Sequence, residues 1–171
     1  RASAGFAVVL DALRSADLSL EIYDRIEPDP TLPEVEAARR AALDFGADMV
    51  VAYGGGSPLD AGKTIAMLAR NNAPLEDYLY VRKTYDQTGL PFIAVPTTAG
   101  SGSEVTAAAV IRDDERKKKT GLTSPLTFAR LALIDPETHL GMPPGVTAAT
   151  GMDALTHAVE AYTSRNHQPF A

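Results

Sequence analysis

The chain has 171 residues, of which 45% are hydrophobic and 22% are charged, values that are ordinary for a globular domain. This length predicts one domain with the beginning of a second, and it allows a core that needs no disulfide or structural metal. The net charge of −6 disfavours nucleic-acid binding, and the absence of cysteine excludes disulfides, thiolate metal ligands and a cysteine nucleophile.

The sequence contains no apolar window long enough for a membrane span and no recognisable signal peptide at its N-terminus. Together with the absence of cysteine, these features predict a cytoplasmic protein. A basic run over residues 116–119 directly follows three acidic residues. Such a run is typical of a solvated turn, although Lys119 at its end could also reach a phosphate or a ribose.

Helix-like and strand-like segments alternate along the chain. Apolar residues at helical spacing predict helices, and short apolar runs predict strands. We expect helices at residues 4–16, 34–45, 57–71 and 146–162, and strands at residues 18–23, 49–53, 92–95 and 131–134. Repeated strand–loop–helix units predict an α/β fold with a Rossmann-like, largely parallel sheet and flanking helices. Ligands of such sheets bind at the carboxyl ends of the strands, where two glycine-rich loops fall.

The first glycine-rich loop, at residues 54–56, connects an expected strand to an expected helix. Glycines allow the backbone to approach a ligand closely and to adopt positive φ angles. Ser57 is expected to cap the helix, with Pro58 at its first position and Asp60 at its third. The free N–H groups of this helix start would bind a phosphate, although a tight turn that only caps a helix could have the same residues.

Neither of the two common nucleotide-binding motifs fits this loop. The run Gly62-Lys63-Thr64 resembles the end of a P-loop, but the first glycine of that motif would have to stand at Ser57. The Rossmann pattern G-x-G-x-x-G fails because Leu59 occupies the place of its third glycine. The loop therefore indicates a phosphate site that follows neither code.

The second glycine-rich loop, at residues 96–106, follows the expected strand at 92–95. Thr97 and Thr98 can donate hydrogen bonds to pyrophosphate or ribose oxygens, and the glycines of the loop remove steric bulk. A plain connector is the alternative. Two such loops at neighbouring strand ends would clamp a dinucleotide from both sides.

Asp153 and His157 are the chemically most informative pair in the sequence. They lie one helical turn apart in a segment of small and apolar residues, so we expect a buried helix that carries both on one face. A carboxylate and an imidazole in this arrangement could hold half of an Fe²⁺ or Zn²⁺ site, or could form a buried Asp–His hydrogen bond. The other two histidines, His139 and His167, lie outside this helix and are not obvious third ligands.

Three motifs together resemble the iron-containing (group III) alcohol dehydrogenases, which have a dehydroquinate synthase-like fold. They are GGGSPLDAGK at 54–63, PTTAGSGSEVT at 96–106 and GMPPGVTAATGMDALTHAVEAY at 141–162. The resemblance covers nearly the whole chain, with the motifs in the family's order. It implies a dinucleotide-binding α/β domain at residues 1–140, without its first strand, and the start of a helical metal-binding domain at residues 141–171. The chain is therefore expected to be a fragment of a longer enzyme.

The resemblance also implies a role for each matching residue. Asp153 and His157 correspond to the first two metal ligands, while the family's two further histidine ligands lie beyond the end of this chain. The residues implied to bind the cofactor are Gly55, Gly56 and Ser57 at the pyrophosphate, Asp60 near the nicotinamide, Thr97 and Thr98 elsewhere on the cofactor, and Lys119 at its ribose. At residues 28–30 this chain has Pro-Asp-Pro where relatives often have Pro-Asn-Pro, so the family's role is not carried over to Asp29.

The implied activity is the reversible oxidation of an alcohol to an aldehyde or ketone with NAD or NADP, with Fe²⁺ or Zn²⁺ polarising the substrate oxygen. A homo-oligomeric full-length enzyme without nucleic-acid or membrane partners is expected. The alternatives are a metal-free reductase of the same fold, such as a maleylacetate reductase, a phosphate-binding or NTP-hydrolysing module, and a dinucleotide-binding domain without catalysis.

Overall fold

The computed structural model describes residues 4–165. Its helices are α1 (Ala4–Ser15), α2 (Leu32–Phe45), α3 (Gly56–Leu68), α4 (Leu75–Leu79) and α5 (Pro144–Thr163). Its strands are β1 (Val50–Gly54), β2 (Phe92–Pro96), β3 (Ala108–Asp113), β4 (Lys118–Thr123) and β5 (Leu131–Ala132). Three short 3₁₀ turns lie at Ser103–Val105, Pro125–Thr127 and Pro136–His139.

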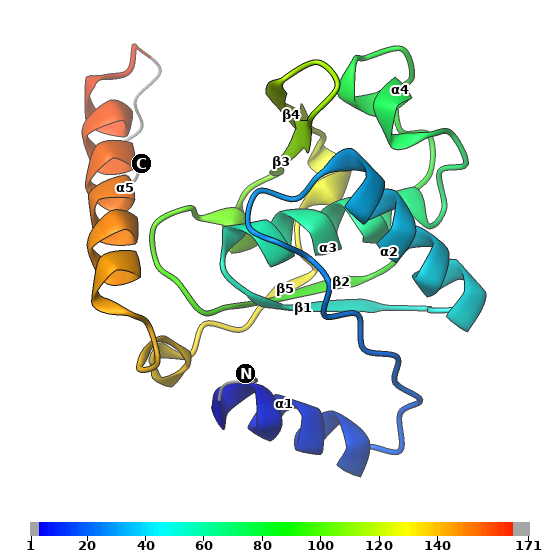
Figure 1. Ribbon diagram of the computed structural model, residues 1–171, viewed down its shortest axis with the longest axis horizontal. Coiled ribbons are helices and arrows are strands. Elements are labelled where there is room, and N and C mark those ends of the chain that lie inside the picture. The colour runs from blue at the N-terminus through cyan, green and yellow to red at the C-terminus, as the bar shows by residue number, and fades with distance from the viewer. Residues whose placement is uncertain (1–3, 166–171) are drawn as a thin grey trace.

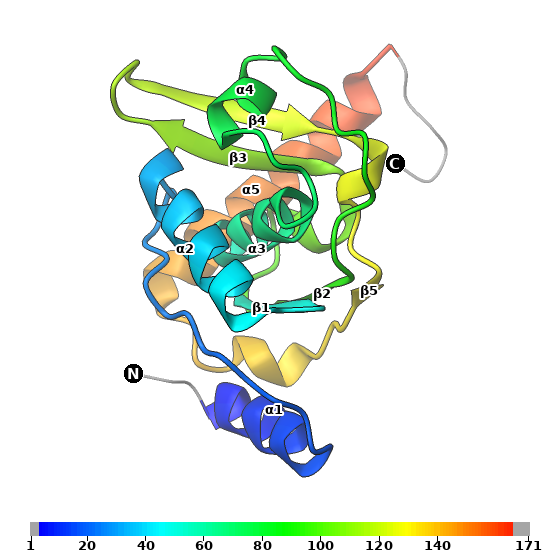
Figure 2. The same cartoon turned by 90° about the vertical axis from the view of Figure 1, so that its right-hand side faces the viewer.

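The strands form two separate sheets. A parallel sheet has the order β1-β2-β5, and its register pairs Gly54 with Pro96, so the two glycine-rich loops leave the sheet side by side. Strands β3 and β4 form an antiparallel hairpin. Figure 2 shows α3 between the hairpin and the parallel sheet, with α1 on the far side of that sheet. The parallel sheet and its helices confirm the predicted α/β fold, while the hairpin was not predicted.

Helix α2 illustrates how closely the local sequence determines an element. Thr31 caps the helix, because its side chain accepts from the Glu34 N–H while the Glu34 carboxylate accepts from the Thr31 N–H at 2.6 Å. Gly46 ends the helix in the left-handed conformation with a φ of 74°. The helix thus lies where the sequence predicts it, with its first turn two residues earlier.

Helix α3 packs directly on the parallel sheet and carries much of the core. Nine of its residues are buried, namely Leu59 and all residues from Ala61 to Leu68. A Cβ on Gly62 would lie 2.7 Å from the Cβ of Ala52 in β1, so this glycine allows helix and strand to touch. Because α3 is fixed so firmly, its N-terminus has a defined position at the carboxyl ends of β1 and β2.

The strand predicted at residues 18–23 is wrong. These residues have no regular secondary structure and no strand partner in the described part of the chain, and Leu18 and Ile22 are half exposed. A cavity of about 460 Å³ lies between this segment, α1, α2 and β1. Alternating apolar residues alone do not make a strand, because a strand also needs a neighbour that accepts its backbone hydrogen bonds.

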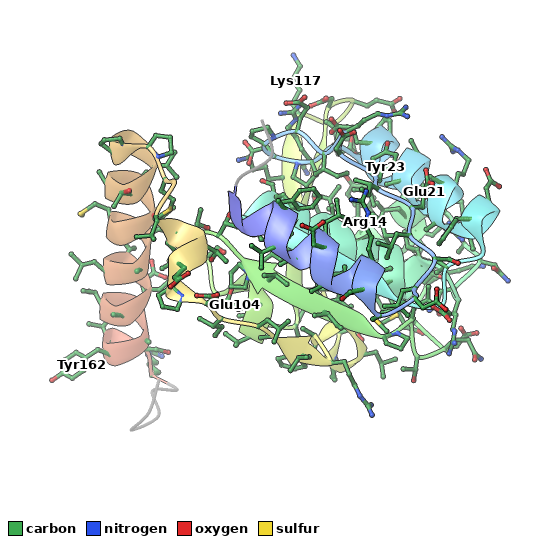
Figure 3. All side chains as sticks on the ribbon, turned by 90° about the horizontal axis from the view of Figure 1, so that it is seen from below. Arg14, Glu21, Tyr23, Glu104, Lys117 and Tyr162 are labelled. Carbon is green, nitrogen blue, oxygen red and sulfur yellow. The ribbon has the colours of Figure 1, made fainter. Side chains whose placement is uncertain are left out.

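Helix α5 lies where the sequence predicts it, but the expectation that it is buried is wrong. None of its residues is buried, and it stands apart from the sheet (Figure 1). Tyr162, which is 84% exposed, points away from the rest of the molecule (Figure 3). Between residues 4 and 165, no helix is both long enough and apolar enough to cross a membrane. The proposed division into two domains near residue 140 stays a prediction.

Candidate cofactor and metal site

The two glycine-rich loops meet at the carboxyl ends of β1 and β2. The Thr97 N–H donates to the Gly54 carbonyl oxygen at 2.9 Å. A Cβ added to Gly55 would lie 3.3 Å from the Thr98 hydroxyl oxygen. A Cβ added to Gly56 would lie 3.1 Å from the Ser101 hydroxyl oxygen. The glycines therefore allow the two loops to lie this close to each other.

Ser57 does not cap α3, so the predicted cap and the box with Asp60 are wrong. The N-cap is Gly55, which has no side chain, and the helix begins at Gly56. The Ser57 hydroxyl oxygen instead accepts from the Asp29 N–H at 3.0 Å. Because no side chain of this helix occupies its first N–H groups, they are available to an anion.

Asp60 holds the second loop and the hairpin against α3. Its carboxylate accepts from the Ser103 hydroxyl at 2.5 Å and from the Val110 N–H at 2.9 Å. Burial raises the pKa of this carboxyl above its usual value, although both hydrogen bonds oppose the shift. With each oxygen already engaged, Asp60 supports the loop that would contact the cofactor.

Lys63 explains why the P-loop-like run is misleading. Its side chain is 1% exposed, and its ammonium donates to the carbonyl oxygens of Ser103, Thr106 and Ala108 at 2.8, 2.9 and 2.6 Å. Burial lowers the pKa of this ammonium, while the nearby Asp60 carboxylate raises it. Three carbonyl acceptors use up the three donors of a lysine, so Lys63 has none left for a phosphate.

Lys119 lies in β4, and the predicted solvated turn covers only the residues before this strand. Its ammonium is 2.7 Å from a carboxylate oxygen of Asp29, and both side chains are about half exposed. Asp29 has a φ of 59°, a left-handed conformation that aspartate tolerates better than most residues. The rigid Pro-Asp-Pro loop thus brings Asp29 beside Ser57 and Lys119, a contact that sequence reasoning missed.

Asp153 and His157 lie on the side of α5 that touches the second loop. The His157 Nε2 is 4.0 Å from the nearer Asp153 carboxylate oxygen, and both side chains are about half exposed. The His157 Nδ1 is 2.9 Å from the Gly100 carbonyl oxygen. Since a carbonyl oxygen only accepts, Nδ1 donates in this contact, and Nε2 is the ring nitrogen that lies beside the carboxylate.

Gly100 allows this contact. Its φ is 146°, and an added Cβ would lie 2.4 Å from the Thr150 carbonyl oxygen of α5. Only glycine therefore allows the loop to approach the helix so closely. A histidine whose second nitrogen is held by a backbone carbonyl is a common arrangement in metal sites.

The donor set of Asp153 and His157 fits half of a metal site. An imidazole and a carboxylate suit Fe²⁺ and Zn²⁺, but a catalytic site needs about three protein ligands. Within residues 4–165, no three histidine, cysteine or acidic side chains come together as a metal site. The His139 ring contacts the Thr138 hydroxyl at 3.1 Å, and His167 lies outside the described residues.

The family model for iron-containing alcohol dehydrogenases matches residues 2–136. The chain belongs to this family. Among its curated relatives, a choline dehydrogenase of Bacillus subtilis is 40% identical over 94% of this chain and 40% of the relative. A lactaldehyde reductase of Escherichia coli is 39% identical over 93% of this chain and 42% of the relative. The chain thus spans about two fifths of the length of these relatives.

Solved structures of the family match the fold as well. An iron-containing alcohol dehydrogenase of Thermotoga maritima has a TM-score of 0.87 and 38% identity, over 96% of this chain and 45% of the other. A sulfoacetaldehyde reductase of Bifidobacterium kashiwanohense, solved in complex with NAD⁺, has a TM-score of 0.86 and 37% identity over the same shares of the two chains. These matches confirm the fold class and the family resemblance seen in the motifs.

Proposed function

We propose that the full-length protein is an NAD(P)-dependent, metal-containing alcohol dehydrogenase, and that this chain supplies the cofactor site and half of the metal site. One observation carries the proposal. The loop at residues 96–103 borders the glycine-rich loop on one side and holds His157 through the Gly100 carbonyl on the other. The two halves of such an active site would therefore be adjacent. A location in the cytoplasm stays a prediction.

The cofactor's pyrophosphate would bind at the N-terminus of α3. The N–H groups of Gly55, Gly56 and Ser57 supply donors there, and the helix dipole favours a negative charge. Thr97 and Thr98 would contact the dinucleotide from the second loop, and Lys119 would reach its ribose. Asp60 would fix the geometry near the nicotinamide through its bonds to Ser103 and Val110.

Asp153 and His157 would be two ligands of a divalent metal, either Fe²⁺ or Zn²⁺. Such a metal supplies Lewis acidity toward the oxygen of an alcohol substrate, whose hydride passes to the nicotinamide. The Gly100 carbonyl orients the imidazole so that its free nitrogen faces the Asp153 side. Further ligands would come from residues that follow this chain in the full-length protein.

The test uses the full-length protein with Fe²⁺ or Zn²⁺, a short primary alcohol and NAD⁺, with NADH formation followed by absorbance. Metal content is measured separately by elemental mass spectrometry. The double variant Asp153→Ala, His157→Ala is expected to lose bound metal and activity together. Retention of both would exclude the metal role of this pair, and full activity without metal would favour a metal-free reductase.

A matched control is available in the same chain. Asp135 and His139 are the same residue types at the same spacing, and they lie in and before a short 3₁₀ turn. The double variant Asp135→Ala, His139→Ala is expected to keep its metal content. NAD⁺ binding by either double variant would show that the nucleotide site is intact.

A further inference from the structure

We propose that a polar cavity at the C-terminal end of α3 binds a phosphate group, either as the free ion or as a phosphate ester. The cavity has a volume of about 720 Å³ and lies between the segment that follows α3 and the loop at residues 83–87. It would be a second ligand site, independent of the proposed alcohol dehydrogenase activity.

The cavity is far from the candidate cofactor and metal site. Helix α3 is roughly 20 Å long, since it has 13 residues, with the two glycine-rich loops at its N-terminus and the cavity at its C-terminus. Figure 1 shows α4 on the opposite side of the molecule from α5, which carries Asp153 and His157. A ligand in the cavity would therefore not touch a dinucleotide bound at the other end of α3.

A buried amide holds the two walls of the cavity together. The side chain of Asn71, which is 1% exposed, donates to the carbonyl oxygens of Met67 and Gln87 at 2.8 and 3.0 Å. Its oxygen accepts from the N–H groups of Asp86 and Gln87, both at 3.2 Å. Four hydrogen bonds from one buried side chain thus fix the loop to the end of α3.

Packing holds the same loop from its other side. The ring of Tyr85 stacks on that of Tyr78 in α4, with the ring centroids 4.5 Å apart and an angle of 12° between the ring planes. A Cβ added to Gly89 would lie 2.6 Å from the Ala66 carbonyl oxygen, so the loop returns directly against α3. The cavity is therefore a part of the folded structure and not a gap under a loose loop.

Two cations line the cavity, one from each wall. Arg70 directly follows the end of α3 and Lys83 lies in the loop, and in the described part of the chain neither forms a salt bridge. The adjacent Arg82, by contrast, is 3.5 Å from a Glu76 carboxylate oxygen and 3.6 Å from one of Asp77. The charges of Arg70 and Lys83 are thus available to an anion.

The cavity is positively charged in an acidic chain. Asp86 is the one carboxylate among its described lining residues, so two cations and one carboxylate give a net charge of +1, whereas the whole chain carries −6. Thr84, Asn72 and Gln87 add a hydroxyl and two amides that can donate hydrogen bonds. Arginine and lysine bind phosphate through charge-assisted hydrogen bonds, and a phosphate group in the cavity would bridge the two cations.

The experiment measures the binding of inorganic phosphate and of methyl phosphate to the full-length protein, by isothermal titration calorimetry at constant ionic strength. Wild type is expected to bind at least one of the two probes. The double variant Arg70→Gln, Lys83→Gln should bind that probe at least about tenfold more weakly, because both charge-assisted contacts are lost. The probe that wild type binds more tightly shows whether the cavity takes the free ion or an ester.

A matched control removes the same charge elsewhere. The double variant Arg40→Gln, Lys118→Gln replaces an arginine in α2 and a lysine in β4, neither of which lines the cavity, and should bind phosphate like wild type. All four replaced residues are exposed, so both variants should keep the melting temperature of wild type without phosphate. Amide hydrogen exchange locates the site, since phosphate should slow the exchange of residues 83–87 in wild type and not in the cavity variant.

Three results would overturn the inference. Wild type could bind neither probe in the millimolar range, the cavity variant could bind phosphate as tightly as wild type, or both double variants could lose binding equally. The second result would assign the phosphate to another site, such as the N-terminus of α3. None of these measurements depends on alcohol oxidation, so the proposed function is tested separately.

Discussion

Helices α3 and α5 both consist mainly of small and apolar residues, and each carries charged or titratable side chains among them. In α3, nine residues are buried and Lys63 donates to three carbonyl oxygens. In α5, no residue is buried, and the Gly100 carbonyl contacts the His157 ring at 2.9 Å. Lys63, which looks like part of a nucleotide-binding motif, is therefore structural, whereas the Asp153–His157 pair lies on an exposed helix.

Replacing Lys63 should have the largest effect on the free energy of unfolding, and it tests most directly whether Lys63 is structural. Lys63→Met removes the buried donor of three carbonyl oxygens and a positive charge that interacts with Asp60. We expect a loss of about 3–5 kcal/mol in the free energy of unfolding, measured by urea titration. The control Lys117→Met, at the tip of the hairpin in Figure 3, should change it by less than about 0.5 kcal/mol. A similarly small loss for Lys63→Met would show that Lys63 is not structural.

A methionine-to-alanine substitution in each helix compares how tightly α3 and α5 are packed. Met67 in α3 is 1% exposed, and Met152 in α5 is 60% exposed. Met67→Ala should lower the free energy of unfolding of residues 1–171 by about 2–5 kcal/mol, because it opens a cavity in the core. Met152→Ala should change it by less than about 0.5 kcal/mol. Equal losses for the two variants would mean that α5 is packed as tightly as α3.

Gly100 is the point at which the second loop meets α5. Gly100→Ala places a Cβ against the Thr150 carbonyl oxygen and puts alanine at a φ of 146°, a strain of about 1–3 kcal/mol. We expect the loop and α5 to separate, with a loss of bound metal from the full-length protein. Gly121→Ala is the control, since its Cβ would have no neighbour closer than 3.9 Å. Unchanged metal content in Gly100→Ala would contradict the proposed support of His157.

The hairpin gives the smallest predicted effect, and it depends on pH. The Tyr80 hydroxyl donates to the Asp113 carboxylate at 2.6 Å, and this bond, together with Arg116, lowers the pKa of Asp113 to about 2. A lowered carboxyl pKa adds stability above the usual value of 3.8, and this stability is lost as the pH falls toward 2. Asp113→Asn should therefore flatten the fall of the free energy of unfolding between about pH 4 and pH 2.

Tyr80→Phe is the matched variant for this prediction. It removes the donor with the largest influence on the Asp113 pKa and keeps the aromatic ring. The pH dependence should weaken in the same direction as in Asp113→Asn, but less, because Arg116 still pairs with the carboxylate at 2.8 Å. Identical pH profiles for wild type and both variants would contradict the role of this bond.

Those elements that are determined by local chemistry could be predicted from the sequence. Gly46 marks the end of α2, and the compact apolar runs in β1 and β2 mark buried parallel strands. The positions of the two loops at neighbouring strand ends follow from this order. The Asp153–His157 pair could be found because helical spacing alone brings the two side chains together.

The remaining features depend on contacts between distant parts of the chain. Leu18 and Ile22 have the spacing of a strand, but the described residues offer that segment no partner. The Ser57 hydroxyl accepts from Asp29, 28 residues away, and no local rule distinguishes this bond from a helix cap. The burial of α5 was wrongly predicted. An apolar helix indicates that another surface should cover it, but its own sequence does not show which residues form that surface.

The contact between the Gly100 carbonyl and His157 would couple the binding of the dinucleotide to the binding of the metal. The loop that carries it borders the glycine-rich loop at Gly56 and holds the imidazole of His157, so an occupant of either half-site would restrict the same backbone. If the first ligand orders this loop, the second ligand binds without losing the same conformational entropy, and the two ligands bind with positive cooperativity. Linkage then requires reciprocity: metal should tighten dinucleotide binding by the same factor by which the dinucleotide tightens metal binding.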